Sequence, residues 1–338
     1  MKSIVCQKPG ELFLKEQPRP SLSAGNALVR MKRLGICGTD LHAYGGRQPF
    51  FSYPRILGHE LSAEIVEIDG GQTGLQVGET VAVIPYLECG GCIACRNGKP
   101  NCCVNMQVLG VHRDGGMSEY LSIPADHLIK NNRLSPDQLA LTECFSIGAH
   151  AVRRAAVQPG EQVLVIGAGP IGLGIMQFAR IAGGSVIALD ISKERLDFVE
   201  KHIPVQHTIQ AGTVAVAQRL AEITNNDFPT VIFDATGNRQ SMMDGFLYLA
   251  HGGRYVLVSL VTADISFPDP ELHKRETTLL SSRNALRADF EWVMECMADN
   301  KVKTAPMITH RCSFVDLAEQ FPLWTRPESS VIKGIVEF

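Results

Sequence analysis

The sequence lacks the features that mark membrane proteins and nucleic-acid-binding proteins. Its longest apolar stretch, VLVIGAGPIGLGIMQFA, is interrupted by glycines and a proline, which suit a strand-turn-helix better than a lipid-facing helix. Lysine and arginine are scattered without a basic stripe, and the formal net charge is -3. A nucleic-acid-binding surface needs such a stripe. We therefore expect neither a membrane nor a nucleic acid among the partners of this chain.

An export signal is also missing from the N-terminal stretch. MKSIVCQKPGELFLKE has no long apolar core and no small-residue cleavage site, so we expect a cytoplasmic protein. In a reducing compartment we interpret the ten cysteines as metal ligands or buried side chains in preference to disulfides. The isolated Cys6, Cys296 and Cys312 are interpreted as small buried hydrophobic residues.

The pattern of apolar residues changes along the chain. With 338 residues, 45% hydrophobic and 20% charged, the length suggests two domains. Up to about residue 140, short apolar stretches between glycines, prolines and polar turns predict a β-rich region. From about residue 150, strands and helices alternate, which predicts a parallel sheet covered on both faces. The tail is predicted to form a helix, then loops, then a closing strand, SVIKGIVEF.

The segment VLVIGAGPIGLG carries a dinucleotide-binding pattern. Its glycines have G-x-G-x-x-G spacing, follow a buried β-branched run and open a helix whose N-terminus would face phosphate. Asp190 ends the next predicted strand, where a carboxylate binds the ribose hydroxyls and repels a 2'-phosphate, so NAD is favoured over NADP. A ligand-free turn, and Asp190 as a helix-capping residue, are the alternatives. The predicted cofactor-binding residues are Gly167, Gly169, Pro170, Ile171, Gly172, Asp190, Arg195 and Ser259.

A second pattern is the cysteine-rich stretch ECGGCIACRNGKPNCC. Cys89, Cys92 and Cys95 follow one another at intervals of three, and Cys103 lies eight positions further on. Thiolates at this spacing can close a tetrahedron around one zinc ion, and four thiolates fill every position, so the ion is predicted to be structural. Cys102 could exchange roles with its neighbour, because the spacing does not choose between them. A zinc-ribbon module for nucleic acid is the other functional interpretation, and the charge balance disfavours it.

Two further motifs supply ligands for a second metal ion. GICGTDLH and LGHE contain Cys37 and His59, and a catalytic zinc needs about three protein ligands and one open position. A third ligand must come from elsewhere in the chain. The stretch ALTECFSIGAH offers a carboxylate, Glu143, beside a thiol, Cys144, in apolar surroundings. Neighbouring residues on a helix point about 100° apart, so both cannot easily serve one pre-formed site.

These motifs together resemble a known family, the medium-chain zinc-dependent alcohol and polyol dehydrogenases. CGTDLH, GHE, the four-cysteine stretch and GAGPIG occur in the family's order and approximate spacing, across essentially the whole chain. Within the family the chain is most similar to the sorbitol and threonine dehydrogenase branch. It is especially similar to bacterial sugar-acid dehydrogenases that oxidise L-galactonate or L-gulonate at carbon 5. MKSI, YPRILGHE, LGVHRDGGMSEY and SSRNA carry that closer similarity.

The resemblance implies an α/β protein of two domains. A GroES-like, β-rich catalytic domain would comprise residues 1–148 and 286–338, with a structural zinc lobe at about residues 86–105. A Rossmann domain with a doubly wound parallel sheet would comprise residues 149–285 and bind NAD. Members of the polyol branch are usually tetramers or dimers through the Rossmann domain. The resemblance therefore implies a homo-oligomer, with GRYVLVSL as a candidate intersubunit edge.

The resemblance also implies roles around the second metal. Glu143 falls on the family's glutamate ligand, with Cys144 in place of the usual proline. Cys37, His59 and Glu143 are therefore the predicted ligands of a catalytic zinc, and two zinc ions per chain are expected. Glu60 would lie beside the metal, sometimes binding it and sometimes holding its water.

The reaction implied by the resemblance is oxidation of a secondary alcohol of a polyol or sugar acid to a ketone by NAD⁺. Thr39 matches the family's hydroxyl that hydrogen-bonds the substrate oxygen. His42 matches the histidine that passes the proton to solvent, a task suited to an imidazole of pKa roughly 6.5. Arg283 is a candidate for binding the substrate's carboxylate or hydroxyls, or else for a salt bridge or subunit contact. A threonine-type amino-alcohol dehydrogenase and a non-catalytic relative are the rival interpretations.

Overall fold

The structure, a computed structural model, describes residues 1–49, 51–69 and 74–338. By its internal contacts the chain divides into two compact units, each with a hydrophobic core of its own. The boundary between them falls inside helix α3 (Pro136–Ala155), after Cys144. The first unit comprises Met1–Cys144, Leu286–Asn300 and Thr304–Phe338, and the second comprises Phe145–Ala285 and Lys301–Lys303. Within the described ranges, no helix has both the length and the apolar character needed to span a membrane.

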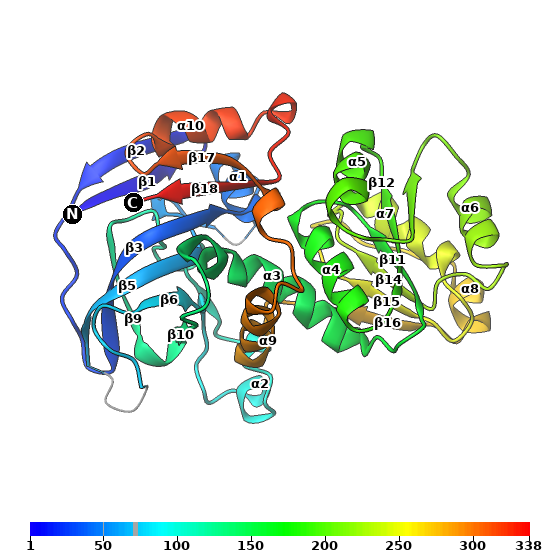
Figure 1. The fold of residues 1–338 in the computed structure, drawn as a ribbon, viewed down its shortest axis with the longest axis horizontal. Coiled ribbons are helices and arrows are strands. Elements are labelled where there is room, and N and C mark those ends of the chain that lie inside the picture. The colour runs from blue at the N-terminus through cyan, green and yellow to red at the C-terminus, as the bar shows by residue number, and fades with distance from the viewer. Residues whose placement is uncertain (50, 70–73) are drawn as a thin grey trace. The chain divides into compact units, whose positions relative to one another are not determined.

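The first unit is rich in strands, as its N-terminal sequence predicts. They are β1 (Lys2–Lys8), β2 (Glu11–Glu16), β3 (Asn26–Ile36), β4 (Arg55–Ile56), β5 (Glu60–Ile68), β6 (Thr80–Val83), β7 (Tyr86–Leu87), β8 (Gln107–Val108), β9 (Tyr120–Pro124), β10 (Leu128–Lys130), β17 (Ile308–Ser313) and β18 (Lys333–Glu337). The largest sheet has the order β10-β6-β5-β3-β18-β17, with β9 also paired to β3 (Figure 1). A smaller sheet has the order β2-β1-β4, and β7 pairs with β8. The long, buried β3 is the common neighbour of β5, β9 and β18, so it organises the unit.

The helices of the first unit are short apart from α9 and the beginning of α3. They are α1 (Gly38–Tyr44), α2 (Ile93–Arg96), α9 (Arg287–Ala298) and α10 (Leu317–Trp324), with 3₁₀ turns η1 (Pro100–Cys102), η2 (Ala125–His127), η4 (Ala305–Met307) and η5 (Pro327–Ser329). The prediction of loops between the C-terminal helix and the closing strand is wrong, because β17 and α10 occupy that segment. The edge strand β17 is only partly buried, so its sequence, ITHRCS, shows no continuous apolar run.

The second unit is an alternation of strands and helices. Its strands are β11 (Gln162–Ile166), β12 (Ser185–Asp190), β13 (His207–Gln210), β14 (Val231–Asp234), β15 (Arg254–Leu257) and β16 (Thr278–Ser281). Its helices are α4 (Pro170–Ile181), α5 (Lys193–His202), α6 (Val216–Ile223), α7 (Arg239–Asp244) and α8 (Asp269–Lys274), with the 3₁₀ turn η3 (Gly245–Tyr248). The strands pair in parallel in the order β13-β12-β11-β14-β15-β16. The predicted doubly wound sheet is therefore confirmed, and the strand order reverses between β11 and β14.

Candidate functional site

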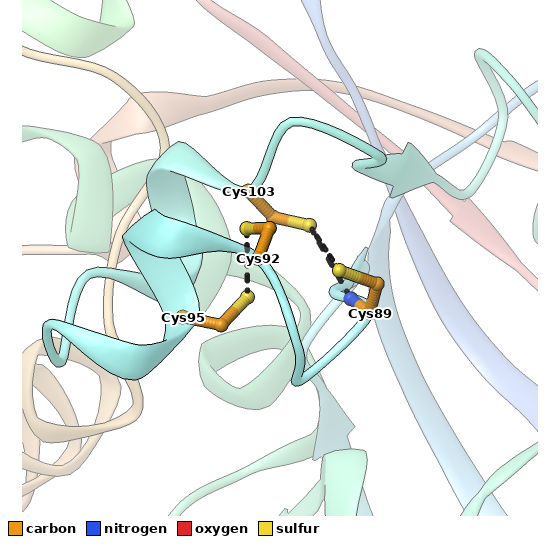
Figure 2. A group of neighbouring side chains, drawn as sticks. All are labelled: Cys89, Cys92, Cys95 and Cys103. Carbon is orange, nitrogen blue, oxygen red and sulfur yellow. Dashed lines mark hydrogen bonds between the residues drawn. The ribbon is translucent and has the colours of Figure 1, made fainter.

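The four cysteines of the first unit's lobe, Cys89, Cys92, Cys95 and Cys103, form one tight group (Figure 2). Their sulfur atoms all lie within 4.8 Å of one another. The Sγ atoms of Cys92 and Cys95 are 3.4 Å apart, and those of Cys89 and Cys103 are 3.5 Å apart. The exposed Cys102 is not a member of the group. The geometry therefore favours Cys103 over its neighbour as the fourth ligand.

Backbone N–H groups of the lobe favour the thiolate form at Cys89 and Cys92, whereas desolvation and the neighbouring sulfurs raise the pKa of Cys95 to about 12. Backbone N–H groups of Cys95 and Val104 donate to Cys92 and lower the pKa of its thiol to about 6. Backbone N–H groups of Cys89 and Asn105 donate to the sulfur of Cys103, each at 3.3 Å. The thiolate is the form that binds zinc. Four such donors around one point fit a closed tetrahedral zinc site.

A second group lies where β3, α1 and β5 meet. Cys37 precedes α1, His59 directly precedes β5, and Glu60 is the first residue of β5. Their donor atoms lie within 4.8 Å of one another. Asp40 joins the two motifs, because its carboxylate accepts the backbone N–H of Cys37 at 2.9 Å and that of Gly58 at 3.0 Å. One buried carboxylate thus fixes both turns that present the ligands.

Glu60 also has a cationic partner. The ammonium of Lys333, on β18, lies 2.6 and 2.8 Å from the two carboxylate oxygens of Glu60 and 3.1 Å from the carbonyl oxygen of Ile36. Both side chains are almost fully buried. A Cβ atom added to Gly35, on the intervening β3, would lie 2.1 Å from a carboxylate oxygen of Glu60. Glycine at this position therefore gives the Glu60 side chain room to reach across β3.

Glu143 lies on α3 and is bonded differently. The hydroxyl of Tyr86, on β7, donates a hydrogen bond to Oε1 of Glu143, and both side chains are buried. Glu143 is not a member of the group formed by Cys37, His59 and Glu60. Its charge nevertheless contributes to the raised pKa of His59, so it belongs to the same environment.

The neighbouring Cys144 is 1% exposed, and its thiol is isolated from water. Burial raises the pKa of this thiol well above its ordinary value. Burial raises the pKa of Glu143 as well, so these directions do not separate the two residues. The hydrogen bond from Tyr86 to Glu143 is what favours Glu143 as the functional member of the pair and Cys144 as a packed thiol.

The chemistry of these donors fits zinc. Burial alone would lower the pKa of His59, but the negative charges of Asp40 and Cys37 outweigh it and raise that pKa. Negative charge is therefore concentrated around this imidazole. A thiol, an imidazole and a carboxylate within reach of one point are donors that zinc takes in catalytic sites. A divalent cation would also offset the negative charge concentrated there.

Thr39 and His42 both lie on α1, immediately after Cys37. Residues three apart on a helix share one face. Thr39 is half-buried and His42 is exposed in the last turn. Partial desolvation and the positive charge of Arg47 lower the pKa of His42. The imidazole is therefore neutral at physiological pH and able to accept a proton.

The predicted dinucleotide-binding residues lie at the carboxyl ends of the parallel strands of the second unit. Gly167 follows β11 with φ +100°, which favours glycine, and Gly169 precedes α4. A Cβ atom added to Gly172 would lie 1.8 Å from the carbonyl oxygen of Gly167, so only glycine allows this approach of helix to strand. Pro170 and Ile171 form the first turn of α4. The turn therefore presents a helix N-terminus at the point where the strand order reverses.

Asp190 holds this turn from the end of β12. Its carboxylate accepts the backbone N–H of Ala168 at 2.6 Å and that of Ser192 at 2.8 Å. The cap of α5 is Ser192, whose side chain accepts the N–H of Arg195, so capping does not account for Asp190. Arg195 approaches the carbonyl oxygen of Ala168 at 3.5 Å. Ser259 lies just beyond β15, and its N–H bonds to the carbonyl oxygen of Asp234 at 3.4 Å.

Arg283 lies beyond β16 and is exposed. The structure places it in the second unit, apart in sequence from the metal motifs of the first. Its role as a substrate-binding residue stays a prediction.

Three residues near the metal ligands were not predicted from the sequence: Asp40, Tyr86 and Lys333. Asp40 could have been found, since an acid three residues after the residue preceding a helix is a capping pattern and the structure shows that cap. Lys333 stands in the apolar stretch SVIKGIVEF, where a buried charge requires a partner. Tyr86 has no such signal.

Comparison with known proteins follows the same division of the chain. The family model "Alcohol dehydrogenase GroES-like domain" matches residues 23–133, and the model "Zinc-binding dehydrogenase" matches residues 170–299. The L-galactonate-5-dehydrogenase of Escherichia coli K12 is 44% identical over 338 residues, covering 100% of this chain and 99% of the relative. The sorbitol dehydrogenase of Halalkalibacterium halodurans is 30% identical over 316 residues, covering 92% of each.

A solved structure agrees over the full length. The crystal structure of an alcohol dehydrogenase, RspB, from Escherichia coli CFT073 with NADH has a TM-score of 0.94 at 32% identity, covering 100% of this chain and 99% of that chain. The fold and the two donor groups define an oxidoreductase that uses zinc and a nicotinamide cofactor. More specifically, the chain belongs to the zinc-binding alcohol and polyol dehydrogenase family, the medium-chain type, as its sequence motifs predict.

Proposed function

We propose that the chain oxidises a secondary alcohol of a polyol or sugar acid to a ketone with NAD⁺, and that L-galactonate and L-gulonate are the first substrates to test. The observation that carries the proposal is the sulfur, nitrogen and oxygen donor group at Cys37, His59 and Glu60, in which the imidazole and the carboxylate are buried. It occurs in a chain 44% identical to a protein named L-galactonate-5-dehydrogenase.

The two donor groups are assigned to two zinc ions. Cys89, Cys92, Cys95 and Cys103 would hold the structural ion. Cys37, His59 and Glu143 would hold the catalytic ion, which when bound supplies Lewis-acid polarisation that makes the substrate hydroxyl more acidic.

Glu60 is assigned a place beside the catalytic metal. Lys333 already neutralises Glu60 and approaches both of its oxygens. Glu143, in contrast, has a neutral hydrogen-bond partner, the hydroxyl of Tyr86. Burial raises the pKa of Glu143, so its ionised form gains more from a cation bound beside it.

The first helix supplies the proton relay. The hydroxyl of Thr39 can accept one hydrogen bond while it donates another, so it can take up the proton that the substrate loses. His42, one helical turn further on, can accept that proton in its neutral form and release it to solvent. The lowered pKa of His42 keeps this form populated.

The second unit would bind the cofactor, which when bound supplies the hydride acceptor. The turn at Gly167 and Gly169 presents backbone N–H groups for the pyrophosphate. Asp190 uses two acceptor positions on backbone N–H groups, and an ionised carboxylate has about four. Asp190 can therefore still bind ribose hydroxyls and repel a 2'-phosphate, while Arg195 softens that preference.

Two assignments concern partners. Arg283 would bind the carboxylate of a sugar acid with its planar guanidinium group. The chain would form a homo-oligomer, a dimer or tetramer, through its parallel-sheet unit. Arg283→Ala should reduce activity toward sugar acids more than activity toward neutral polyols, and equal losses would remove Arg283 from carboxylate binding.

The experiment that tests the proposal is a screen of NAD⁺ reduction across polyols, aldonates and amino alcohols, with zinc content measured in parallel. We expect two zinc ions per chain and the highest kcat/KM with an aldonate or polyol. Preference for threonine would instead establish an amino-alcohol dehydrogenase. Absence of turnover with all three classes would contradict the proposed substrate range.

A further inference from the structure

Tyr86 is a buried residue beside the catalytic donor group that the proposed reaction does not use. It is 4% exposed and lies on β7, and its hydroxyl donates a hydrogen bond to Oε1 of Glu143. Glu143 is 5% exposed. A buried hydroxyl or carboxylate without a partner costs free energy. The hydroxyl and the carboxylate therefore satisfy each other's hydrogen-bonding capacity in a buried position.

The ring of Tyr86 is held on several sides. It packs edge-on against Phe290, with ring centroids 6.2 Å apart at an interplanar angle of 75°. Its carbonyl oxygen lies 3.1 Å from Nε2 of His127, which is the donor because a carbonyl only accepts. Its strand pairs with β8 opposite Val108. The hydroxyl is therefore presented from a fixed ring.

The hydrogen bond bears on how Glu143 can bind a metal. Metal-ligating carboxylates are oriented by hydrogen bonds from neighbouring groups, and loss of such a partner weakens metal binding. We propose that Tyr86 is a positioning residue for the catalytic zinc: its hydroxyl engages one oxygen of Glu143 and fixes the orientation in which this carboxylate would meet the metal. This inference rests on the proposed assignment of Glu143 as a ligand.

Comparison with Glu60 explains why the identity of the partner matters. An ammonium group has three donors, and those of Lys333 lie near both oxygens of Glu60 and the carbonyl oxygen of Ile36. Glu60 is thereby neutralised. A phenol hydroxyl orients Glu143 without cancelling its charge. Lys333 and Tyr86 together select which of the two buried carboxylates binds zinc.

The test measures zinc release from the intact, zinc-loaded protein. Purified wild type and Tyr86→Phe are mixed with an excess of a chromogenic chelator, and catalytic zinc is identified as the release phase missing from Cys37→Ala. We expect release from Tyr86→Phe to be faster by about tenfold, the lower end of the effect of losing such a partner. The slower phase, from the four-cysteine lobe, should be unchanged. The visible absorption spectrum of the cobalt-substituted protein should change as well.

A matched control removes a similar hydroxyl elsewhere. Tyr255 is fully buried in the second unit, and its hydroxyl donates to the carbonyl oxygen of Met242 at 3.0 Å. Tyr255→Phe makes the same chemical change far from the metal ligands in sequence, and it should leave both release phases unchanged. Equal acceleration in the two variants would attribute the effect to general loosening and overturn the inference.

A double variant distinguishes this inference from the ligand assignment beneath it. If Tyr86 acts through Glu143, then Tyr86→Phe combined with Glu143→Ala should release zinc no faster than Glu143→Ala alone. Additive effects, or an unchanged release rate and cobalt spectrum in Tyr86→Phe, would overturn the role of Tyr86 while the ligand role of Glu143 stands. Unchanged release from Glu143→Ala would remove the ligand assignment and the inference together.

Discussion

The first and last cysteines of the lobe are fourteen positions apart, whereas Glu60 and Lys333 of the catalytic environment are 273 positions apart. The lobe uses sulfur alone, and only Cys103 among its four thiols is buried. The catalytic group mixes sulfur, nitrogen and oxygen, and His59 and Glu60 are buried. The lobe is a single local loop, whereas the catalytic group depends on a partner, Lys333, that only the pairing of distant strands brings to Glu60.

The difference shows what each group requires from the rest of the molecule. Four thiolates satisfy a zinc ion completely, so the lobe needs only a backbone that brings them together. A site that keeps one position open for a substrate has fewer ligands, and its buried charges must be balanced by other residues. Lys333 balances the charge of Glu60, Tyr86 satisfies an oxygen of Glu143 with a hydrogen bond, and Asp40 fixes the turns that present Cys37 and His59. None of the three was expected from the sequence.

The comparison is tested most severely by Cys37→Ala. Loss of this ligand should remove only the catalytic zinc, so that metal analysis finds one ion per chain in place of two. We expect kcat/KM to fall by about a thousandfold, because the Lewis acid contributes several kcal/mol and each ~1.4 kcal/mol is a factor of ten. Cys144→Ala, which removes a buried thiol nearby, should keep both ions. Two zinc ions in Cys37→Ala would show that it is not a ligand.

The balance of buried charge in the catalytic group is tested by Lys333→Met. Removing the cation leaves the carboxylate of Glu60 buried without its partner, which should lower the free energy of unfolding by about 3–5 kcal/mol. Urea denaturation of the zinc-loaded protein measures this change. Adding Glu60→Gln should restore most of the stability, because the stranded charge is then gone. If Lys333→Met combined with Glu60→Gln were as unstable as Lys333→Met alone, the unpaired charge of Glu60 would not be the cause of the lost stability.

The link between the lobe and the catalytic group is tested by Cys103→Ala. This variant should also contain one zinc ion, but its catalytic ion should remain, and its melting temperature should fall because a structural zinc contributes folding free energy. The lobe lies between β7 and β8, and β7 carries Tyr86, so a loosened lobe should also speed release of the catalytic zinc. This acceleration should be no larger than the roughly tenfold effect expected when the hydroxyl of Tyr86 is removed. Cys102→Ala is the control and should retain both ions. Full zinc content in Cys103→Ala would reassign the fourth ligand.

The smallest expected effect concerns the proton relay. Arg47 helps to lower the pKa of His42, so Arg47→Gln should raise that pKa. The neutral imidazole would then be lost at a higher pH as the solution is acidified. The acid limb of the profile of kcat/KM against pH should therefore move upward, most clearly at low salt. Arg219→Gln, an exposed change in the second unit, should leave the profile in place. If the acid limb stayed in place in Arg47→Gln, it would not report the protonation of His42.

The parts of the molecule that could be predicted from the sequence are those with local signals. The buried runs at β11, β12, β14 and β15 and the glycine-rich turn predict the parallel sheet, because each element carries its own periodicity. The four cysteines are recognisable for the same reason. The edge strand β17 was missed because a half-buried strand with polar side chains lacks a continuous apolar run.

The supporting residues of the catalytic group could not be predicted, because their roles depend on partners that only the fold brings close. Tyr86 and Glu143 are 57 positions apart, and no spacing rule connects them. Lys333 stands out as a charge in an apolar strand, but its pairing with Glu60 depends on β18 and β5 both lying beside β3. The need for glycine at position 35 is evident only from the structure, where the Glu60 side chain passes over this residue.

The strand β7, which carries Tyr86, ends two positions before Cys89. Short loops close at a lower entropic cost than contacts between distant parts of a chain, so the lobe should capture its ion earlier during folding than the catalytic group. The β7–β8 pair would then already be in place when Glu143 arrives on its helix. When the unfolded chain is refolded with zinc, the lobe should therefore load before the catalytic group does, and activity should appear only in the later of the two steps.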